Sequence, residues 1–214
     1  MVTRQAMVAA LLEQRGRTFC AELAIPIGCG TPSPLFRWLC ASLLMSARIS
    51  TDIAVKAARA LAEAGWTTPR KMAAASWEER VKVLNRAGYA RYDESTSRML
   101  GETCDLLIER YRGDLRKLRA AAGRDTDTER AHLKAFKGIG DVGVDIFFRE
   151  AQLVWDELYP FADKRALEAG GRLGLPADAA GLARQVSRED FPRLVAGLAR
   201  LKRADEFEQI RQAA

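Results

Sequence analysis

The sequence predicts an all-α protein, and three observations carry that prediction. Apolar residues recur at helical spacing along almost the whole chain, no segment alternates with a period of two for long enough to form a strand, and capping residues and glycines mark helix ends. The 214 residues, 48% of them hydrophobic, can bury a substantial core. One domain or two small lobes are therefore expected.

Helix boundaries are legible in the first half of the chain. The signals are proline at the first helical position, Ser or Thr as N-cap, a Ser–x–x–Glu capping box and glycine after the last turn. They predict a helix over residues 1–17, helices from Ser33-Pro34 and from Ser50 or Thr51, a short helix from Thr68-Pro69, a helix from the Ser76 and Glu79 capping box to Gly88, and a long helix over residues 93–111.

The second half of the chain has fewer signals. The polar stretch 121–130 is predicted to be a loop that leads into a helix capped by Thr126 or Thr128. Roughly the last forty residues should hold two more helices, the second starting near Ser187 with acidic residues in its first turn.

The charge balance favours a polyanionic partner. The formal net charge is +6, and each phosphate that a cation neutralises releases condensed counterions. As an alternative, an Arg-rich and Ala-rich chain can be basic without binding any anion. No run of about 18 apolar residues exists and the N-terminus lacks the apolar centre of a signal peptide, so no membrane partner is expected. We expect a cytoplasmic protein, associated with the nucleoid if it is bacterial.

The cysteines and the histidine do not indicate a metal site. Cys20, Cys29, Cys40 and Cys104 form no C-x-x-C pair, and His132 is the one histidine of the chain. Small, buried and reduced thiols are the expected state.

Residues 131–150 carry the first candidate site. A helix ending near Phe136 meets Lys137-Gly138-Ile139-Gly140, and a second helix begins at Asp141 or Val142. Two glycines allow a tight turn through positive φ, while Ile139 fills the space between the helices. Unpaired N–H groups at the start of the second helix can bind an anion such as a DNA phosphate. An ordinary helix corner fits this short pattern equally well.

Asp163 is the second candidate. It follows a turn that contains Pro160 and precedes a helix through Leu167, which is the position of an N-cap. A carboxylate there would also be ionised and held rigidly, as an electrostatic partner for a developing cation must be.

These features, in order and with their spacing, resemble the helix-hairpin-helix (HhH-GPD) superfamily of base-excision DNA glycosylases, of the endonuclease III kind. The resemblance covers roughly residues 33–176. It rests on the segments Ser33-Pro34-Leu35-Phe36, Leu43 to Ser50, Gly88-Tyr89-Ala90-Arg91-Tyr92, the hairpin, Asp163-Lys164-Arg165 and Arg172-Leu173-Gly174-Leu175.

The resemblance implies a two-lobed helical protein. A six-helix lobe would span residues 30–158, with the helix-hairpin-helix at about 131–155, and residues 1–29 and 159–214 would form a second lobe that carries the Asp. Double-stranded DNA would lie across the cleft between the lobes, and a base would be flipped out of the stack. The Asp would stabilise positive charge on the sugar or activate the attacking water. A monomer is expected, and a monovalent cation at the hairpin is compatible with the resemblance.

Three departures from the family pattern bear on chemistry. Val142 stands where members that also nick the strand carry a lysine nucleophile, so water would be the nucleophile and an abasic site the product. No cysteines near the C-terminus are present to hold an iron–sulfur cluster, so no cofactor is expected. The wedge position, often Gln, is Arg48, and Lys164-Arg165 replaces Thr-His, which would favour the ionised form of Asp163 or contact phosphates.

Two functions from different classes follow. The first is a monofunctional DNA N-glycosylase; the second is a non-catalytic DNA-binding module, in which Asp163 is an N-cap whose replacement by Asn changes little. A helical protein–protein adaptor is a third reading. In the first, Asp163 is catalytic, Arg48 is the wedge, and the DNA contacts are Gly138, Ile139, Gly140, Val142, Lys137, Lys164 and Arg165, with Lys134 and Arg149 as secondary ones.

The aromatic residues near the candidate sites are expected to lie mainly in the core. Tyr89 and Tyr92 are candidates for a base pocket or strand contact, and core packing is the simpler interpretation. Phe147, Phe148 and Trp155 are also assigned to the core.

Overall fold

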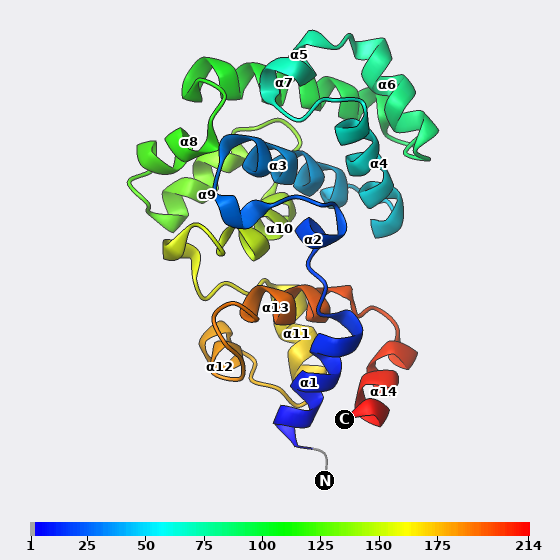
Figure 1. Cartoon of the computed structure of the whole chain (residues 1–214), viewed down its shortest axis with the longest axis vertical. Coiled ribbons are helices and arrows are strands. Elements are labelled where there is room, and N and C mark those ends of the chain that lie inside the picture. Colours follow the sequence, from blue (N-terminus) through cyan, green and yellow to red (C-terminus); the bar gives the residue numbers. More distant parts are fainter. Residues whose placement is uncertain (1–2) are drawn as a thin grey trace. The chain divides into compact units, whose positions relative to one another are not determined.

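The structure is a computed structural model that describes residues 3–214, and over this range it is helical with no strand (Figure 1). The all-α prediction is confirmed. The α-helices are α1 (Arg4–Arg15), α2 (Phe19–Glu22), α3 (Pro32–Ser46), α4 (Thr51–Glu63), α5 (Pro69–Ala74), α6 (Trp77–Arg86), α7 (Asp93–Tyr111), α8 (Leu115–Ala121), α9 (Thr126–Lys134), α10 (Asp141–Ala151), α11 (Lys164–Arg172), α12 (Ala179–Ala183), α13 (Phe191–Arg200) and α14 (Ala204–Ala213).

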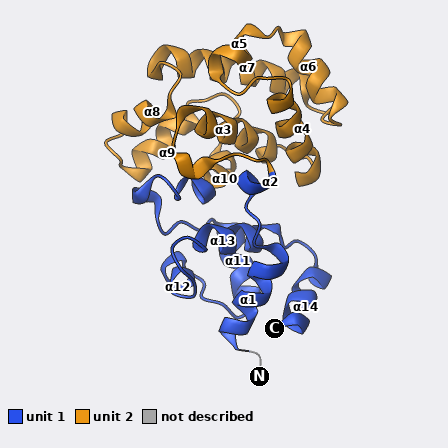
Figure 2. Cartoon of the chain, in the orientation of Figure 1, with its two compact units in different colours: residues 1–22, 148–214 blue, residues 23–147 orange. Residues whose placement is uncertain are grey.

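The chain divides into two compact units (Figure 2). Unit 1 consists of residues 1–22 and 148–214, of which Met1 and Val2 lie outside the described residues; unit 2 consists of residues 23–147. The division falls within α10, whereas the sequence places the lobe boundaries after residues 29 and 158.

Most of the local signals act as expected. Ser50 and Thr68 cap α4 and α5 through their hydroxyl oxygens. Ser76 and Glu79 form both halves of the capping box of α6. Gly65 and Gly88 follow helix ends with positive φ, where glycine has no steric penalty.

Some helix starts and the number of helices differ from the predictions. Thr31 and Pro32 begin α3, and the Ser33 hydroxyl instead donates to the Thr67 carbonyl. Asp125, not Thr126 or Thr128, caps α9, because a carboxylate competes better for the N–H groups. Helix α8, capped by Asp114, was not predicted because it is only seven residues long. The C-terminal region holds three helices, and α13 begins at Phe191 after a turn from Ser187.

Unit 2 is built around α3, which lies among the other helices of this unit (Figure 1). Its apolar residues are almost completely buried. The Trp38 indole N–H donates to the Phe147 carbonyl at 2.9 Å, and the Tyr89 hydroxyl donates to the Leu44 carbonyl at 3.0 Å. Tyr89 is fully buried, so its assignment to the core is confirmed.

Unit 1 packs α1 against α13 and α14, and α11 against α13. A buried carboxylate ties the N-terminal segment to α10: Glu150 accepts hydrogen bonds from the backbone N–H groups of Phe19 at 2.6 Å and Cys20 at 2.8 Å. Burial raises the pKa of Glu150, although the two N–H groups oppose that shift.

Candidate functional site

The turn between α9 and α10 has the geometry of a tight glycine hairpin. Gly138 has φ +84°, and a Cβ atom there would lie 2.6 Å from the sulfur of Met99 on α7. Ile139 is buried as predicted and lies against Gly143 on α10. Gly140 differs from the prediction, because it does not have positive φ and a Cβ there would meet nothing within 4 Å.

The start of α10 presents unpaired donors. Within the described part of the chain, the N–H groups of Gly140, Asp141, Val142 and Gly143 have no hydrogen-bond acceptor, as expected for the first turn of a helix. Gly140 and Asp141 are exposed, and Val142 is 60% exposed. These donors, together with the helix dipole, suit an anion.

The cations of the hairpin are partly engaged by its own acids. Lys134 donates to Asp141 at 2.8 Å, and this hydrogen bond lowers the pKa of Asp141. Arg130 donates to Asp145 at 2.7 Å. Lys137 is exposed at the tip of the turn. The hairpin therefore offers N–H groups and little net positive charge.

Asp163 lies at the start of α11, as the sequence predicts, and it is only 6% exposed. One carboxylate oxygen accepts from the backbone N–H groups of Arg165 and Ala166 at 3.0 and 3.2 Å. The other accepts from Nε and Nη2 of Arg149 at 2.9 and 2.7 Å. The Asp163 carboxylate thus forms the N-cap that the sequence predicts and also a buried ion pair with Arg149 that the sequence did not reveal.

Gln152 holds the turn that carries Asp163. Its amide donates to the carbonyls of Arg149 and Phe161 at 2.7 and 3.0 Å, and its oxygen accepts from the Phe161 N–H at 3.0 Å. The Phe161 ring also packs edge-on against Phe148. Asp163 and Arg149 are therefore fixed by one hydrogen-bonded network that joins the end of α10 to the start of α11.

The other predicted contact residues lie at the surface. Arg48 is exposed on the bend between α3 and α4, and Tyr92 is half-buried with the Arg91 guanidinium over its ring. Lys164 and Arg165 are exposed at the start of α11, and Lys164 is 3.8 Å from Glu168. The cation that forms an ion pair with Asp163 is Arg149, and not Lys164 or Arg165, which follow Asp163 in the sequence.

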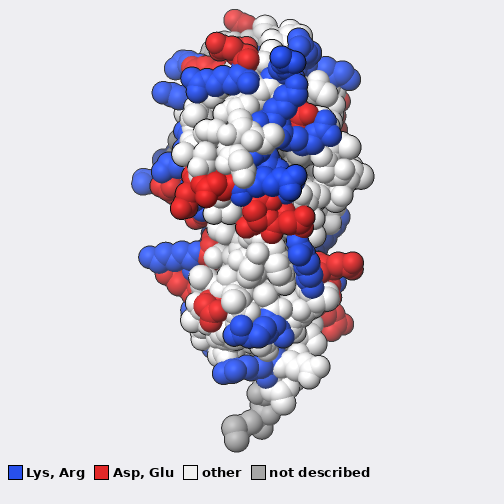
Figure 3. All heavy atoms as spheres, turned by 90° about the vertical axis from the view of Figure 1, so that its left-hand side faces the viewer, with Lys and Arg blue, Asp and Glu red and all other residues white. Residues whose placement is uncertain are grey.

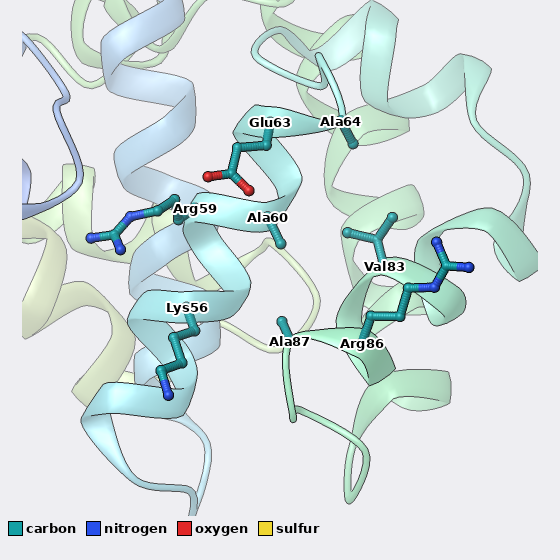
Figure 4. A pocket seen from close by; sticks show the side chains of 8 residues that line it. All are labelled: Lys56, Arg59, Ala60, Glu63, Ala64, Val83, Arg86 and Ala87. Carbon is teal, nitrogen blue, oxygen red and sulfur yellow. The ribbon is translucent and has the colours of Figure 1, made fainter.

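Unit 2 also contains an open groove of about 470 Å³ between α4 and α6. Figure 4 shows small apolar side chains facing each other across it, with charged residues at its edges; the lining residues are Lys56, Arg59, Ala60, Glu63, Ala64, Val83, Arg86 and Ala87. Among residues 3–214 no group of His, Cys, Asp and Glu is arranged to hold a metal ion. No helix in that range has both the length and the apolar character needed to cross a bilayer.

Comparison with known proteins links this geometry to one fold. No protein-family model matches the sequence, and no curated protein is significantly similar to it. A solved structure of a trapped endonuclease III–DNA covalent intermediate, an estranged-adenine complex, is similar with a TM-score of 0.50 and 18% identity, over 93% of this chain and 85% of that chain. At this identity the likeness shows the fold: the chain has the all-α helix-hairpin-helix fold of endonuclease III.

Proposed function

We propose that this protein binds double-stranded DNA through its hairpin and removes an altered or mispaired base as a monofunctional DNA N-glycosylase. The observation that carries the proposal is the endonuclease III-like fold over 93% of the chain, since the similar structure holds DNA. The exposed N–H groups at the start of α10 support a phosphate contact, with Gly138, Gly140, Val142 and Lys137 forming the contact surface. Ile139, which the sequence also suggested as a contact, is buried and its N–H donates to the Phe136 carbonyl at 3.0 Å, so it supports the turn from within.

The proposed reaction is hydrolysis of the N-glycosyl bond. Water adds to the anomeric carbon of a flipped nucleotide, the bond from that carbon to the base breaks, and the base leaves with a proton, so that an abasic site remains. Asp163 would stabilise the positive charge on the sugar, and the reaction needs no cofactor. Val142 has no amine, so the strand is not cut by Schiff-base chemistry.

A glycosylase screen tests this proposal. The protein is incubated with duplexes that carry uracil, alkylated purines, hypoxanthine, oxidised pyrimidines or adenine opposite oxidised guanine, and each product is analysed with and without hot alkali. Strand breaks only after alkali are the expected result and name the lesion. Breaks without alkali would contradict the monofunctional assignment, and no release from any duplex would contradict the activity.

Val142→Lys is expected to introduce Schiff-base chemistry. Val142 is 60% exposed at the start of α10, so a lysine amine there can attack the open-chain aldehyde of an abasic site. Borohydride should then trap a covalent complex of this variant with an abasic duplex, and none with the wild type. Leu153→Lys, at an exposed apolar position outside the hairpin, is the matched control. Equal trapping by both variants would show that trapping is not specific to position 142, and no trapping by Val142→Lys above the wild-type level would contradict an approach of the hairpin to the abasic site.

Gly138→Ala and Gly140→Leu are expected to separate folding from binding. Ala at positive φ should lower the free energy of unfolding by about 1–2 kcal/mol. Leu at position 140 enters open space, so stability should change little, while the side chain covers the N–H groups and weakens duplex binding about tenfold or more. Urea denaturation and fluorescence anisotropy measure the two effects. Unchanged affinity of Gly140→Leu would argue against the phosphate contact.

The ion pair of Asp163 favours a second candidate, a non-catalytic DNA-binding protein of the same fold. A carboxylate that is 6% exposed and accepts four hydrogen bonds has its charge largely compensated by Arg149. In that case the protein binds duplexes in a salt-sensitive manner and releases no base in the screen.

A further inference from the structure

The positive charge of the chain is concentrated in residues 110–124, here called the basic segment. It contains the end of α7, α8 and the following turn, and holds six Lys or Arg and one Asp, a net charge of +5 against +6 for the whole chain. Glu109 and Asp125 bound it. Figure 3 shows the side of the molecule on which α8 of unit 2 lies; Lys and Arg side chains are numerous there, with Asp and Glu side chains among them.

The basic segment lies beside the hairpin. Tyr111, between two of the arginines, packs against the first helix of the hairpin: its ring centroid is 6.2 Å from that of His132 and 6.4 Å from that of Phe136. Phe136 directly precedes Lys137 and Gly138. Helix α8 also packs on α9. Both belong to unit 2, so the basic segment and the hairpin form parts of one surface.

The two parts complement each other in charge. At the hairpin, Lys134 and Arg130 are paired with Asp141 and Asp145. In the basic segment Arg116 is paired with Asp114, whereas Arg112, Lys117 and Arg124 are exposed. The hairpin therefore offers backbone N–H donors but little net positive charge, whereas the basic segment carries a net charge of +5.

Two arginines of the segment occupy backbone positions that side chains rarely adopt. Arg112 ends α7 with φ +54°, and Arg124 follows α8 with φ +59°, each next to a glycine with positive φ. Glycine or asparagine suits such positions better than arginine. Both arginines are exposed, as is Lys117 between them. Packing in the core therefore does not explain why arginine, and not glycine, stands at positions 112 and 124.

We propose that the basic segment is a second DNA-contact surface, which binds backbone phosphates next to those held by the hairpin. The inference rests on the proposed DNA binding and adds the residues that supply its electrostatic part. Cationic side chains of this kind position a duplex without reading its sequence. Arg112, Lys117 and Arg124 are the contacts that the proposal names.

The salt dependence of duplex binding tests the proposal. The triple variant Arg112→Asn, Lys117→Gln and Arg124→Asn removes three charges and places Asn where φ is positive. The control, Lys56→Gln, Lys82→Gln and Arg86→Gln, removes three exposed charges on α4 and α6, including two beside the groove of Figure 4. Binding to a fluorescein-labelled, undamaged duplex about two helical turns long is followed by anisotropy between about 0.05 and 0.2 M salt.

The expected result is a loss from the segment variant alone. For this variant the slope of log K against log salt should be shallower by about 2–3, and the affinity should be roughly 100-fold lower near 0.1 M salt. In the control the slope should change by less than about 1, the value for a single phosphate contact. Equal losses in both variants, or an unchanged slope in the segment variant, would overturn the proposal. Absence of salt-sensitive binding by the wild type would instead refute the proposed DNA binding itself.

Discussion

Asp163→Asn is expected to lower the free energy of unfolding by about 3–5 kcal/mol. The wild-type carboxylate offers one oxygen to two backbone N–H groups and the other to Arg149. An amide offers a single oxygen, so its NH₂ group must face either the N–H groups or the guanidinium, and both are donors. Since Arg149 is 6% exposed, water cannot replace the lost acceptor. Urea denaturation followed by circular dichroism measures the loss.

Two further variants show whether Asp163 also acts in catalysis. Arg149→Met breaks the same pair and should cost a similar amount, whereas Arg149→Met with Asp163→Ser removes both charges, keeps a capping oxygen and should regain at least half of the loss. Excision is then compared at a temperature at which every variant is folded. A catalytic Asp163 predicts activity in Arg149→Met and none in Asp163→Asn or the double variant. Excision by the double variant at the wild-type rate would exclude a catalytic role.

Glu150→Gln is expected to lower the free energy of unfolding by about 1–3 kcal/mol. The buried N–H groups of Phe19 and Cys20 each meet one oxygen of the carboxylate, and glutamine can satisfy one of them while its NH₂ group opposes the other. Glu189→Gln, at an exposed position, is the control and should change stability by less than about 0.5 kcal/mol. Equal stability of the two variants would contradict the proposed role of Glu150 in holding the N-terminal segment.

The effect of Glu150→Gln should also depend on pH. Burial raises the pKa of Glu150 above its value in the unfolded chain, so the folded state binds the proton more tightly. That contribution to stability is complete below the unfolded pKa and is lost as pH rises through the folded pKa. The stability difference between wild type and variant should therefore be largest in acid and narrow towards neutral pH. Denaturation curves across this range test the sign, and a difference that widens with pH would contradict it.

The hairpin shows how much of a site local sequence can predict. Lys137-Gly138-Ile139-Gly140 indicated a tight turn with a buried Ile139, and the structure has both. The equivalent prediction of positive φ for Gly140 was wrong, because a single glycine in the left-handed region suffices to reverse the chain. Gly140 is not needed for the geometry of the turn. Because it has no side chain, it leaves open space in front of the N–H groups at the start of α10.

The sequence alone determined four helix starts, because a cap is formed between residues two or three positions apart: Ser50, Thr68, Ser76 and Asp163 each accept from an N–H group within the next turn. The tertiary structure decided which charges meet. Arg149 was expected to face a phosphate and instead faces Asp163, and Glu150 meets N–H groups 131 and 130 residues away. Such pairings depend on which face of α10 packs against the turn and the N-terminal segment, and helical periodicity fixes the faces of a helix without fixing their partners.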